Sequence, residues 1–188
     1  MKKFIYILML FLSTNLFSQS SESLKKVASI SARSITPIGI FSENWNIGGA
    51  LYASYGWIYS EKWSLIFQTG YNRYRLKSAS KYSGAPKLSM FPIQVGGRLY
   101  FLNGGIKPFF EAMSGINFIR LFYKEGDTLV DERETHINFQ IGGGVAFRLN
   151  KNWGIEVATI YNSHLINPSI PYNLTGFEYG IGLNWIFD

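Results

Sequence analysis

The sequence predicts an all-β protein, an eight-stranded antiparallel up-and-down barrel that spans a membrane with its strands. Three observations lead to this prediction. Large apolar residues alternate with small or polar ones along most of the chain, which is typical of strands whose two faces meet different surroundings. Short and long connections alternate between these segments. The composition is 17% aromatic with 19 glycines, which favours sheets and turns over helices.

The N-terminal residues predict a secretory signal peptide. The stretch MKKFIYILMLFLSTNLFSQS has two lysines, nine apolar residues from Phe4 to Leu12, and then small polar residues. A membrane-spanning helix would need roughly 20 apolar residues. We therefore expect residues 1–18 to be removed and residues 19–188 to form one exported domain. The chain has no cysteine, so a lipid-modified N-terminal Cys and disulfide bonds are excluded.

Eight segments carry the alternating pattern of a strand. In chain order they are residues 26–35, 47–59, 63–71, 91–101, 106–118, 136–149, 153–161 and 175–187. The alternation is weakest in the first, which we accept partly because a closed barrel needs an even number of strands. In the fifth, Phe109 and Met113 blur the contrast between the two faces. The other six are regular, and their large faces include Leu51, Trp57, Phe67, Val95, Phe139, Val157, Tyr179 and Leu183.

The connections alternate in length. Three are short turns, at residues 60–62, 102–105 and 150–152. Four are longer links, at residues 36–45, 75–86, 120–135 and 164–174. An up-and-down barrel has this rhythm when its short turns lie at one end and its long loops at the other. In outer-membrane barrels the short-turn end is periplasmic.

The two faces of the strands indicate which one meets lipid. The small face is rich in glycine, as expected where eight strands converge on a narrow interior. The large face has almost no charge in mid-strand. Its aromatic residues gather near the strand ends, as in the belts at membrane interfaces: Trp45, Trp57, Tyr59, Trp63, Tyr71, Trp153, Tyr161, Trp185 and Phe187. The alternative is a soluble exported lipocalin-like binding barrel, whose cavity these aromatics would line.

Three stretches, FPIQVGGRLYF, GIKPFFEAMSGINF and the closing YGIGLNWIF, resemble the small eight-stranded outer-membrane barrels of Gram-negative bacteria. These form the porin-family or PorT-like group, which shares its fold with the transmembrane domain of outer-membrane protein A. The resemblance is one of pattern and covers the chain after residue 18. It implies a location in the outer membrane. It also implies that Phe187 belongs to a C-terminal signal read by the barrel-assembly machinery, although here Asp188 follows the aromatic.

Five charged residues fall on the small, lumen-facing parity: Arg98, Glu111, Arg148, Glu156 and Glu178. Unpaired charges in so confined a space would be costly. We therefore expect the two arginines to pair inside the barrel with some of the three glutamates. Because side chains fill the interior of an eight-stranded barrel, no wide aqueous channel is expected.

The sequence shows no catalytic, metal or cofactor motif. His136 and His164 are its two histidines, and both are interpreted as solvated residues beside loops. A lipid A-modifying enzyme is the weaker alternative, because the lipid A deacylase family also uses an eight-stranded barrel. Its motif resembles H-x-S-N, whereas here Asn162, Ser163 and His164 follow the other order. Neighbouring Ser163 and His164 would also face opposite sides of a strand.

Net charge and the position of two arginines indicate which partners the chain binds. Loss of residues 1–18 lowers the formal net charge from +6 to +4, too little to indicate nucleic acid. Arg73 and Arg75 lie on the lipid-facing parity just beyond Tyr71. Two accounts of these charges stay open: they keep exposed loops soluble, or they contact lipid A phosphates. We thus expect a non-enzymatic, monomeric outer-membrane protein with a structural or surface-interaction role, whose partners are outer-membrane lipid, lipopolysaccharide and the assembly machinery.

Overall fold

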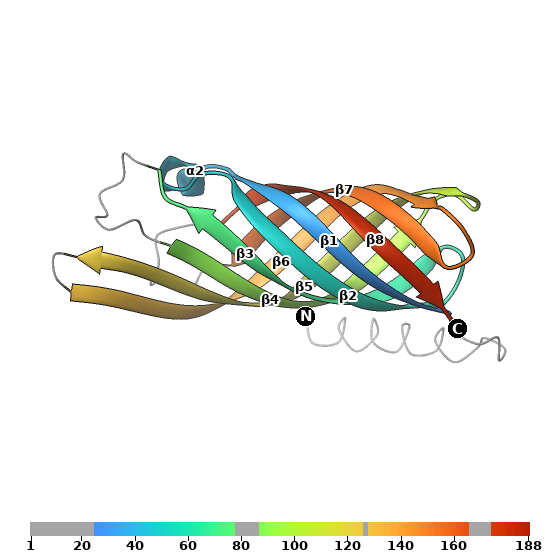
Figure 1. Cartoon of the computed structure of the whole chain (residues 1–188), viewed down its shortest axis with the longest axis horizontal. Helices are drawn as coiled ribbons and strands as arrows, with labels where there is room; N and C mark the ends of the chain where they lie inside the picture. Colours follow the sequence, from blue (N-terminus) through green and yellow to red (C-terminus); the bar gives the residue numbers. More distant parts are fainter. Residues whose placement is uncertain (1–24, 78–86, 126–127, 166–173) are drawn as a thin grey trace, which may run out of the picture.

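The computed structural model describes residues 25–77, 87–125, 128–165 and 174–188. The predicted signal peptide, residues 1–18, lies outside the described residues, as do parts of the second and fourth long links. The described chain forms a closed barrel of eight antiparallel strands (Figure 1). Each strand pairs with the next in sequence, and β8 pairs with β1. This confirms the predicted fold class.

The strands are regular where the sequence alternates and continue past several predicted ends. Their bounds are β1 (Lys25–Pro37), β2 (Gly48–Ile58), β3 (Trp63–Arg75), β4 (Lys87–Tyr100), β5 (Ile106–Glu125), β6 (Thr128–Arg148), β7 (Trp153–Leu165) and β8 (Gly176–Phe187). The short turns lie at the end of the barrel that also holds the C-terminus, and the long links lie at the other (Figure 1).

The two weakest predicted strands complete the barrel. β1 pairs along its length with β2 on one side and β8 on the other, so it closes the cylinder. In β5, Phe109 and Met113 are only 3% and 4% exposed, while Phe110 and Ile116 face outward at 41% and 40%. The pattern of β5 is blurred because part of the interior is itself apolar.

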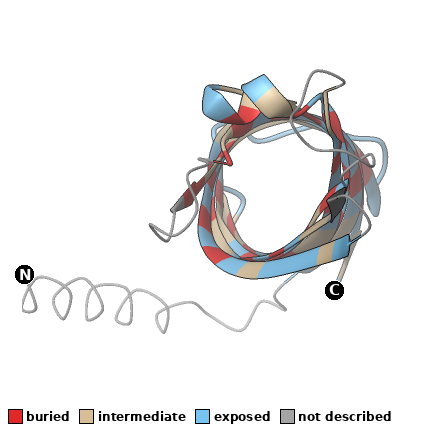
Figure 2. Ribbon diagram, turned by 90° about the vertical axis from the view of Figure 1, so that its left-hand side faces the viewer, coloured by how far each residue is buried: buried red, intermediate tan, exposed pale blue. Residues whose placement is uncertain are grey.

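The barrel is apolar outside and polar inside. Buried and exposed residues alternate along the strands (Figure 2). Leu51, Val95 and Ile181 are 52–63% exposed on the outer face, whereas Gln94 and Asn138 are at most 1% exposed inside. A soluble barrel has the opposite distribution, with its large apolar side chains in the core.

The third long link, predicted at residues 120–135, is a correction. β5 continues to Glu125 and β6 begins at Thr128, and the two strands pair with each other over this whole stretch. The β5–β6 hairpin projects beyond the other strands at the long-loop end (Figure 1). The pattern was missed because charged residues occupy the outer positions here, where the other strands carry large apolar ones.

An apolar plug lies at the long-loop end, beside the short helix α2 (Ile40–Asn44). It consists of Ile35, Phe41, Trp45, Ala50, Tyr52, Tyr74, Leu88, Met90, Ile119 and Leu174. The ring of Phe41 meets that of Tyr74 edge-on at 5.0 Å. Trp45 was predicted in the outer aromatic belt but is 8% exposed, because α2 turns it into the plug. No helix among the described residues is long and apolar enough to cross a membrane.

Candidate functional site

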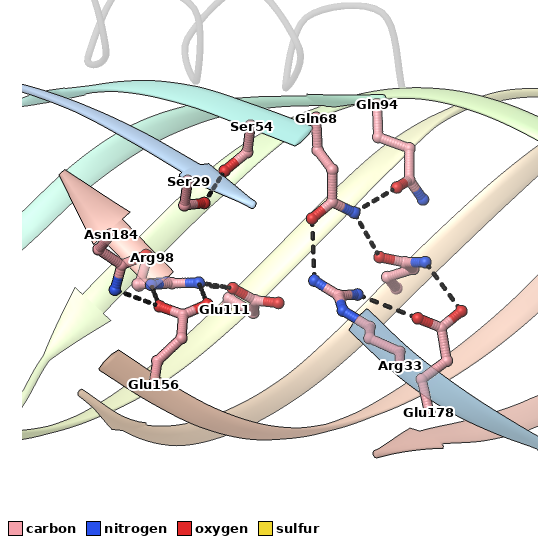
Figure 3. A network of polar contacts seen from close by, with 11 residues as sticks. Ser29, Arg33, Ser54, Gln68, Gln94, Arg98, Glu111, Glu156, Glu178 and Asn184 are labelled. Carbon is pink, nitrogen blue, oxygen red and sulfur yellow. Dashed lines mark hydrogen bonds and ion pairs between the residues drawn. The ribbon is translucent and has the colours of Figure 1, made fainter. Parts of the chain in front are cut away.

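The first polar centre of the interior, the Arg98 centre, joins β4, β5, β7 and β8. Register places Arg98 directly opposite Glu111, and its Nη2 donates to Glu111 Oε2 at 2.7 Å. Nη1 donates to Glu156 Oε2 at 2.6 Å, and that carboxylate also accepts from Asn184 Nδ2 at 3.0 Å. The guanidinium lies over the ring of Phe109, 3.9 Å from its centroid. One arginine thus bridges two buried carboxylates (Figure 3).

The second polar centre, the Arg33 centre, lies closer to the long loops. Arg33 Nη1 donates to Glu178 Oε2 at 3.0 Å, and Nη2 donates to Gln68 Oε1 at 2.9 Å. Gln68 donates in turn to Gln94 Oε1 at 2.9 Å. Three neutral donors, Tyr52 Oη, Gln140 Nε2 and Asn162 Nδ2, point at the other oxygen of Glu178 at 3.1, 3.4 and 2.8 Å. This centre is mostly an amide network around a single ion pair (Figure 3).

The structure brings Arg98, Glu111 and Glu156 together and gives Glu178 a different partner, Arg33, which sequence reasoning missed. Arg33 shares its parity with Ser29 and Ser31 in β1. That run of small polar residues was a usable signal, but the alternation in β1 was too weak to assign its faces.

The prediction for Arg148 needs correction. It has the lumen-facing parity but is exposed, because it is the last residue of β6. Its backbone N–H donates to Gly105 O of a neighbouring turn at 2.7 Å. At a strand end the inward direction leads to solvent at the barrel mouth and no longer into the enclosed interior.

The interpretation of the two histidines is also wrong. His136 and His164 are each 3% exposed, because β6 and β7 extend far enough to place both inside the barrel. Their ring centroids lie 6.4 Å apart. His136 Nε2 is 2.9 Å from Glu134 Oε2, and His164 Nε2 is 2.6 Å from Asn117 Nδ2.

The described residues do not assemble a familiar catalytic or metal site. Ser163 lies opposite Phe139 on the outward parity of β7, whereas His164 points inward, so the serine and the imidazole are on opposite faces of the strand. Within the described ranges, no group of three or more His, Cys, Asp or Glu side chains could hold a metal ion.

The remaining predicted residues lie on the outer surface. Arg73 and Arg75 are exposed near the long-loop end of β3. Strand register places Arg73 opposite Ser89, Ser89 opposite Arg120, and Arg120 opposite Arg133. Three arginines therefore lie in one row across β3 to β6. At the other end, Phe187 contacts Trp185, with ring centroids 4.7 Å apart.

These features define a class of fold: a closed, eight-stranded, up-and-down barrel with a polar interior and an apolar exterior. Solved structures similar to this chain have that fold. They include Neisserial surface protein A (TM-score 0.58, 17% identity, 90% of this chain and 100% of that chain). Ail, the attachment invasion locus protein of Yersinia pestis, was solved with the heparin analogue sucrose octasulfate (TM-score 0.58, 11% identity, 88% and 100%). A third is the outer membrane protein OprG from Pseudomonas aeruginosa (TM-score 0.51, 12% identity, 87% and 95%).

At these identities the likeness establishes the fold alone. No protein-family model matches the chain, and no curated protein matches its sequence. The finer resemblance to porin-family or PorT-like proteins stays a prediction.

Proposed function

We propose that this protein is a non-enzymatic integral outer-membrane barrel of a Gram-negative bacterium, exported through residues 1–18, with a structural or surface-interaction role. The observation that carries the proposal is the inside-out distribution of polarity, with large apolar side chains exposed outside and polar side chains buried inside. A lipid-facing barrel needs an apolar outer band and can carry polar side chains inside. Stacked aromatic pairs near the short turns, Tyr59 with Trp63 and Trp153 with Trp185, fit a membrane interface.

In this proposal the two polar centres and the apolar plug fill the interior, which leaves no wide pore for transport. The Arg98 centre connects β4, β5, β7 and β8. The Arg33 centre links β1 to β3 and β8, and Tyr52 and Gln140 add β2 and β6. The apolar plug covers this centre towards the long loops. We therefore assign the interaction role to the long-loop end of the barrel, where the β5–β6 hairpin projects (Figure 1).

One experiment separates the membrane barrel from the soluble binding barrel. The protein is expressed with its N-terminal segment, membranes are separated from the periplasmic fraction, and each fraction is run with and without boiling on a denaturing gel. We expect the protein in membranes, with a faster band that shifts on boiling, because folded membrane barrels resist unheated detergent. Recovery in the soluble fraction without such a shift would contradict the proposal.

We further propose that Arg73 and Arg75 contact lipid A phosphates in the outer leaflet. Both are exposed on the outward parity beyond Tyr71, and Arg75 lies opposite Lys87 across the β3–β4 pair. The arginine row continues to Arg120 and Arg133, but both of these bind Asp131, so the contact is assigned to Arg73 and Arg75. Guanidinium groups form charge-assisted, often paired hydrogen bonds with phosphate.

The test compares barrel stability in bilayers with and without lipopolysaccharide. We expect the R73Q/R75Q variant to lose most of the stabilisation that lipopolysaccharide gives the parent, with little change in phospholipid alone. The matched control, K62Q/K151Q, removes two exposed charges at the short-turn end and should keep it. Equal stabilisation of the R73Q/R75Q variant and the parent by lipopolysaccharide would contradict the proposed contact.

Phe187 is proposed as part of the signal that the barrel-assembly machinery reads. Its ring is near Trp185 and Tyr55 on the outer face of the short-turn end. Replacement of Phe187 by alanine should slow assembly in cells more than refolding in detergent. An equal effect on both would assign the residue to stability only.

A further inference from the structure

Four buried asparagines form a cluster between the Arg33 centre and the apolar plug. These residues, the asparagine cluster, are Asn72, Asn117, Asn138 and Asn162, from β3, β5, β6 and β7, and each is at most 3% exposed. Strand register pairs Asn162 with Gln140, the inward residue next to Asn138 on β6. Asn117 Nδ2 lies 3.5 Å from the sulfur of Met90, and Met90 pairs with Asn72. The four amides therefore lie on nearby rows of the interior.

Hydrogen bonding around His164 determines the direction of the Asn117 amide. His164 Nδ1 lies 2.5 Å from the backbone oxygen of Leu174, which accepts only, so Nδ1 carries the proton. In the neutral ring Nε2 is then an acceptor, and it receives the Asn117 Nδ2 hydrogen at 2.6 Å. Asn117 Oδ1 is left pointing elsewhere, buried and without a hydrogen-bond partner among the described residues.

The asparagine cluster and its surroundings hold more unpartnered acceptors than donors. Asn162 Nδ2 donates to Glu178, which leaves its Oδ1 unpartnered, and both ends of Asn138 are unpartnered within the described chain. The ends of Asn72 also lack a partner of good hydrogen-bond geometry there, although its amide interacts with the Tyr52 hydroxyl. Nearby, His136 Nε2 faces the carboxylate of Glu134, so its unpartnered Nδ1 is a fifth acceptor in the neutral ring. These five acceptors stand against three amide donors, those of Asn72, Asn138 and Gln94; Gln94 Nε2 is likewise unpartnered and lies across Gly115 from Asn138. Buried acceptors of this kind ordinarily have partners, because an isolated one is costly.

The buried charged side chains also favour a positive ligand, because negative ones outnumber positive ones. The buried charged residues within the described ranges are Arg33, Arg98, Glu111, Glu156 and Glu178. Two positive and three negative side chains give these five residues a formal charge of −1. An acceptor-rich, uncharged site in a negative interior suits a positive guest.

We propose that the asparagine cluster binds one small monovalent cation through its carboxamide oxygens. Neutral oxygen ligands without a direct carboxylate fit a singly charged ion better than Ca²⁺ or Mg²⁺, which favour carboxylates. The plug residues Phe41, Trp45 and Leu174 close the level above, and the Arg33 centre closes the level below. The ion is therefore enclosed: it enters as the barrel folds and exchanges slowly afterwards.

The test folds the barrel into detergent in chloride solutions of potassium, sodium, ammonium or choline at equal ionic strength. Choline is too large for an enclosed site and serves as the ionic-strength control. We expect the midpoint of thermal unfolding to be several degrees higher with at least one small cation than with choline, because a ligand that binds only the folded state stabilises it. Equal midpoints in all four salts overturn the proposal.

Two variants locate the effect. N138L replaces an amide of the cluster with an apolar side chain of similar size and should abolish the dependence on cation. N184L, the matched control, changes a buried asparagine of the Arg98 centre and should lower the midpoint equally in all salts. Cation dependence retained in N138L, or lost in N184L alone, overturns the assignment.

A second measurement covers the case in which N138L does not fold. Crystals of the unaltered barrel grown from protein folded in rubidium chloride should show an anomalous peak bounded by oxygens of the asparagine cluster. Crystals from choline chloride supply the blank. Absence of such a peak in the rubidium crystals, with water or no density at that position, overturns the proposal.

Discussion

The Arg98 and Arg33 centres hold a buried arginine in two different ways. Each guanidinium lies over an aromatic ring, 3.9 Å from the centroid of Phe109 and 4.3 Å from that of Tyr52. All the side-chain hydrogen bonds of Arg98 go to carboxylates, those of Glu111 and Glu156. Arg33 divides its bonds between one carboxylate and one amide.

The two centres differ in how well their carboxylates stay hydrogen-bonded when the arginine is removed. At the Arg98 centre the two carboxylates have one cation between them, and Asn184 is the one neutral donor bonded to them in the described chain. At the Arg33 centre three neutral donors already solvate Glu178. A buried carboxylate that keeps hydrogen-bond donors loses less when its cation is removed. The two arginines should therefore be unequal in their contribution to stability.

The largest effect is expected for R98M. It leaves Glu111 and Glu156 buried with no counter-charge, so the free energy of unfolding should fall by about 3 to 5 kcal/mol. The measurement is urea unfolding of the barrel in lipid bilayers at neutral pH. R148M is the matched control, since Arg148 has the same parity but is exposed; its change should stay within about 0.5 kcal/mol. Equal losses in both variants would mean that the buried pairs do not stabilise the barrel.

R33M should cost less, about 1.5 to 3 kcal/mol in the same assay, the usual range for hydrogen bonds to a charged group. Glu178 keeps the donors from Tyr52, Gln140 and Asn162. Adding E178Q to R33M should restore part of the loss, because the double variant buries no uncompensated charge. A loss for R33M as large as that for R98M would refute the inequality between the two centres.

Parity along the strands was enough to place Arg98, Glu111, Glu156 and Glu178 in the interior. It gives the face of a residue but says little about its depth along the barrel or its partner. Arg148 shows the limit at a strand end, where the predicted parity is right and the residue is still exposed. The pairing of Arg33 with Glu178 depends on the closure of β1 against β8, a contact between the two ends of the chain that no local pattern contains.

The plug and the histidines were missed for a related reason. Phe41 and Trp45 lie in a link, where period-two alternation gives no guidance. The sequence pattern predicts His136 and His164 beside loops because its predicted strands end too early. His136 lies where β6 leaves the barrel wall for the projecting hairpin, and His164 lies near the end of β7, which continues to Leu165.

A smaller effect separates the two carboxylates of the Arg98 centre. One oxygen of Glu111, Oε1, is buried and has no partner among the described residues. E111Q keeps an oxygen that can accept from Arg98 and removes the surplus charge, so it should change stability by less than about 1 kcal/mol. Combined with R98M, it should reduce the loss seen for R98M alone. A double variant no more stable than R98M would show that the loss in R98M does not come from uncompensated negative charge.

The smallest effect is expected at an exposed counterpart of these centres, on the projecting hairpin. Asp131 accepts from Arg120 Nε and Nη2 at 2.7 and 3.0 Å, and from Arg133 Nη2 at 3.0 Å. Hydrogen bonds from Arg120 first, and from Arg133 second, lower the pKa of Asp131 from 3.8 to about 2. Because the pKa in the folded state is depressed, any stabilisation is present above pH 3.8 and is lost as the pH falls towards 2.

Solvent screens this group, since the arginine side chains are 55% and 71% exposed, so global stability should scarcely respond. The measurement is therefore local: a carboxyl-carbon NMR titration of Asp131 in the folded barrel. R120Q should raise its pKa most of the way back to 3.8, and R133Q should raise it less, because Arg133 makes one hydrogen bond to the carboxylate where Arg120 makes two. A midpoint near 3.8 in the unaltered protein would show that the exposed cluster is too mobile to act as the buried centres do.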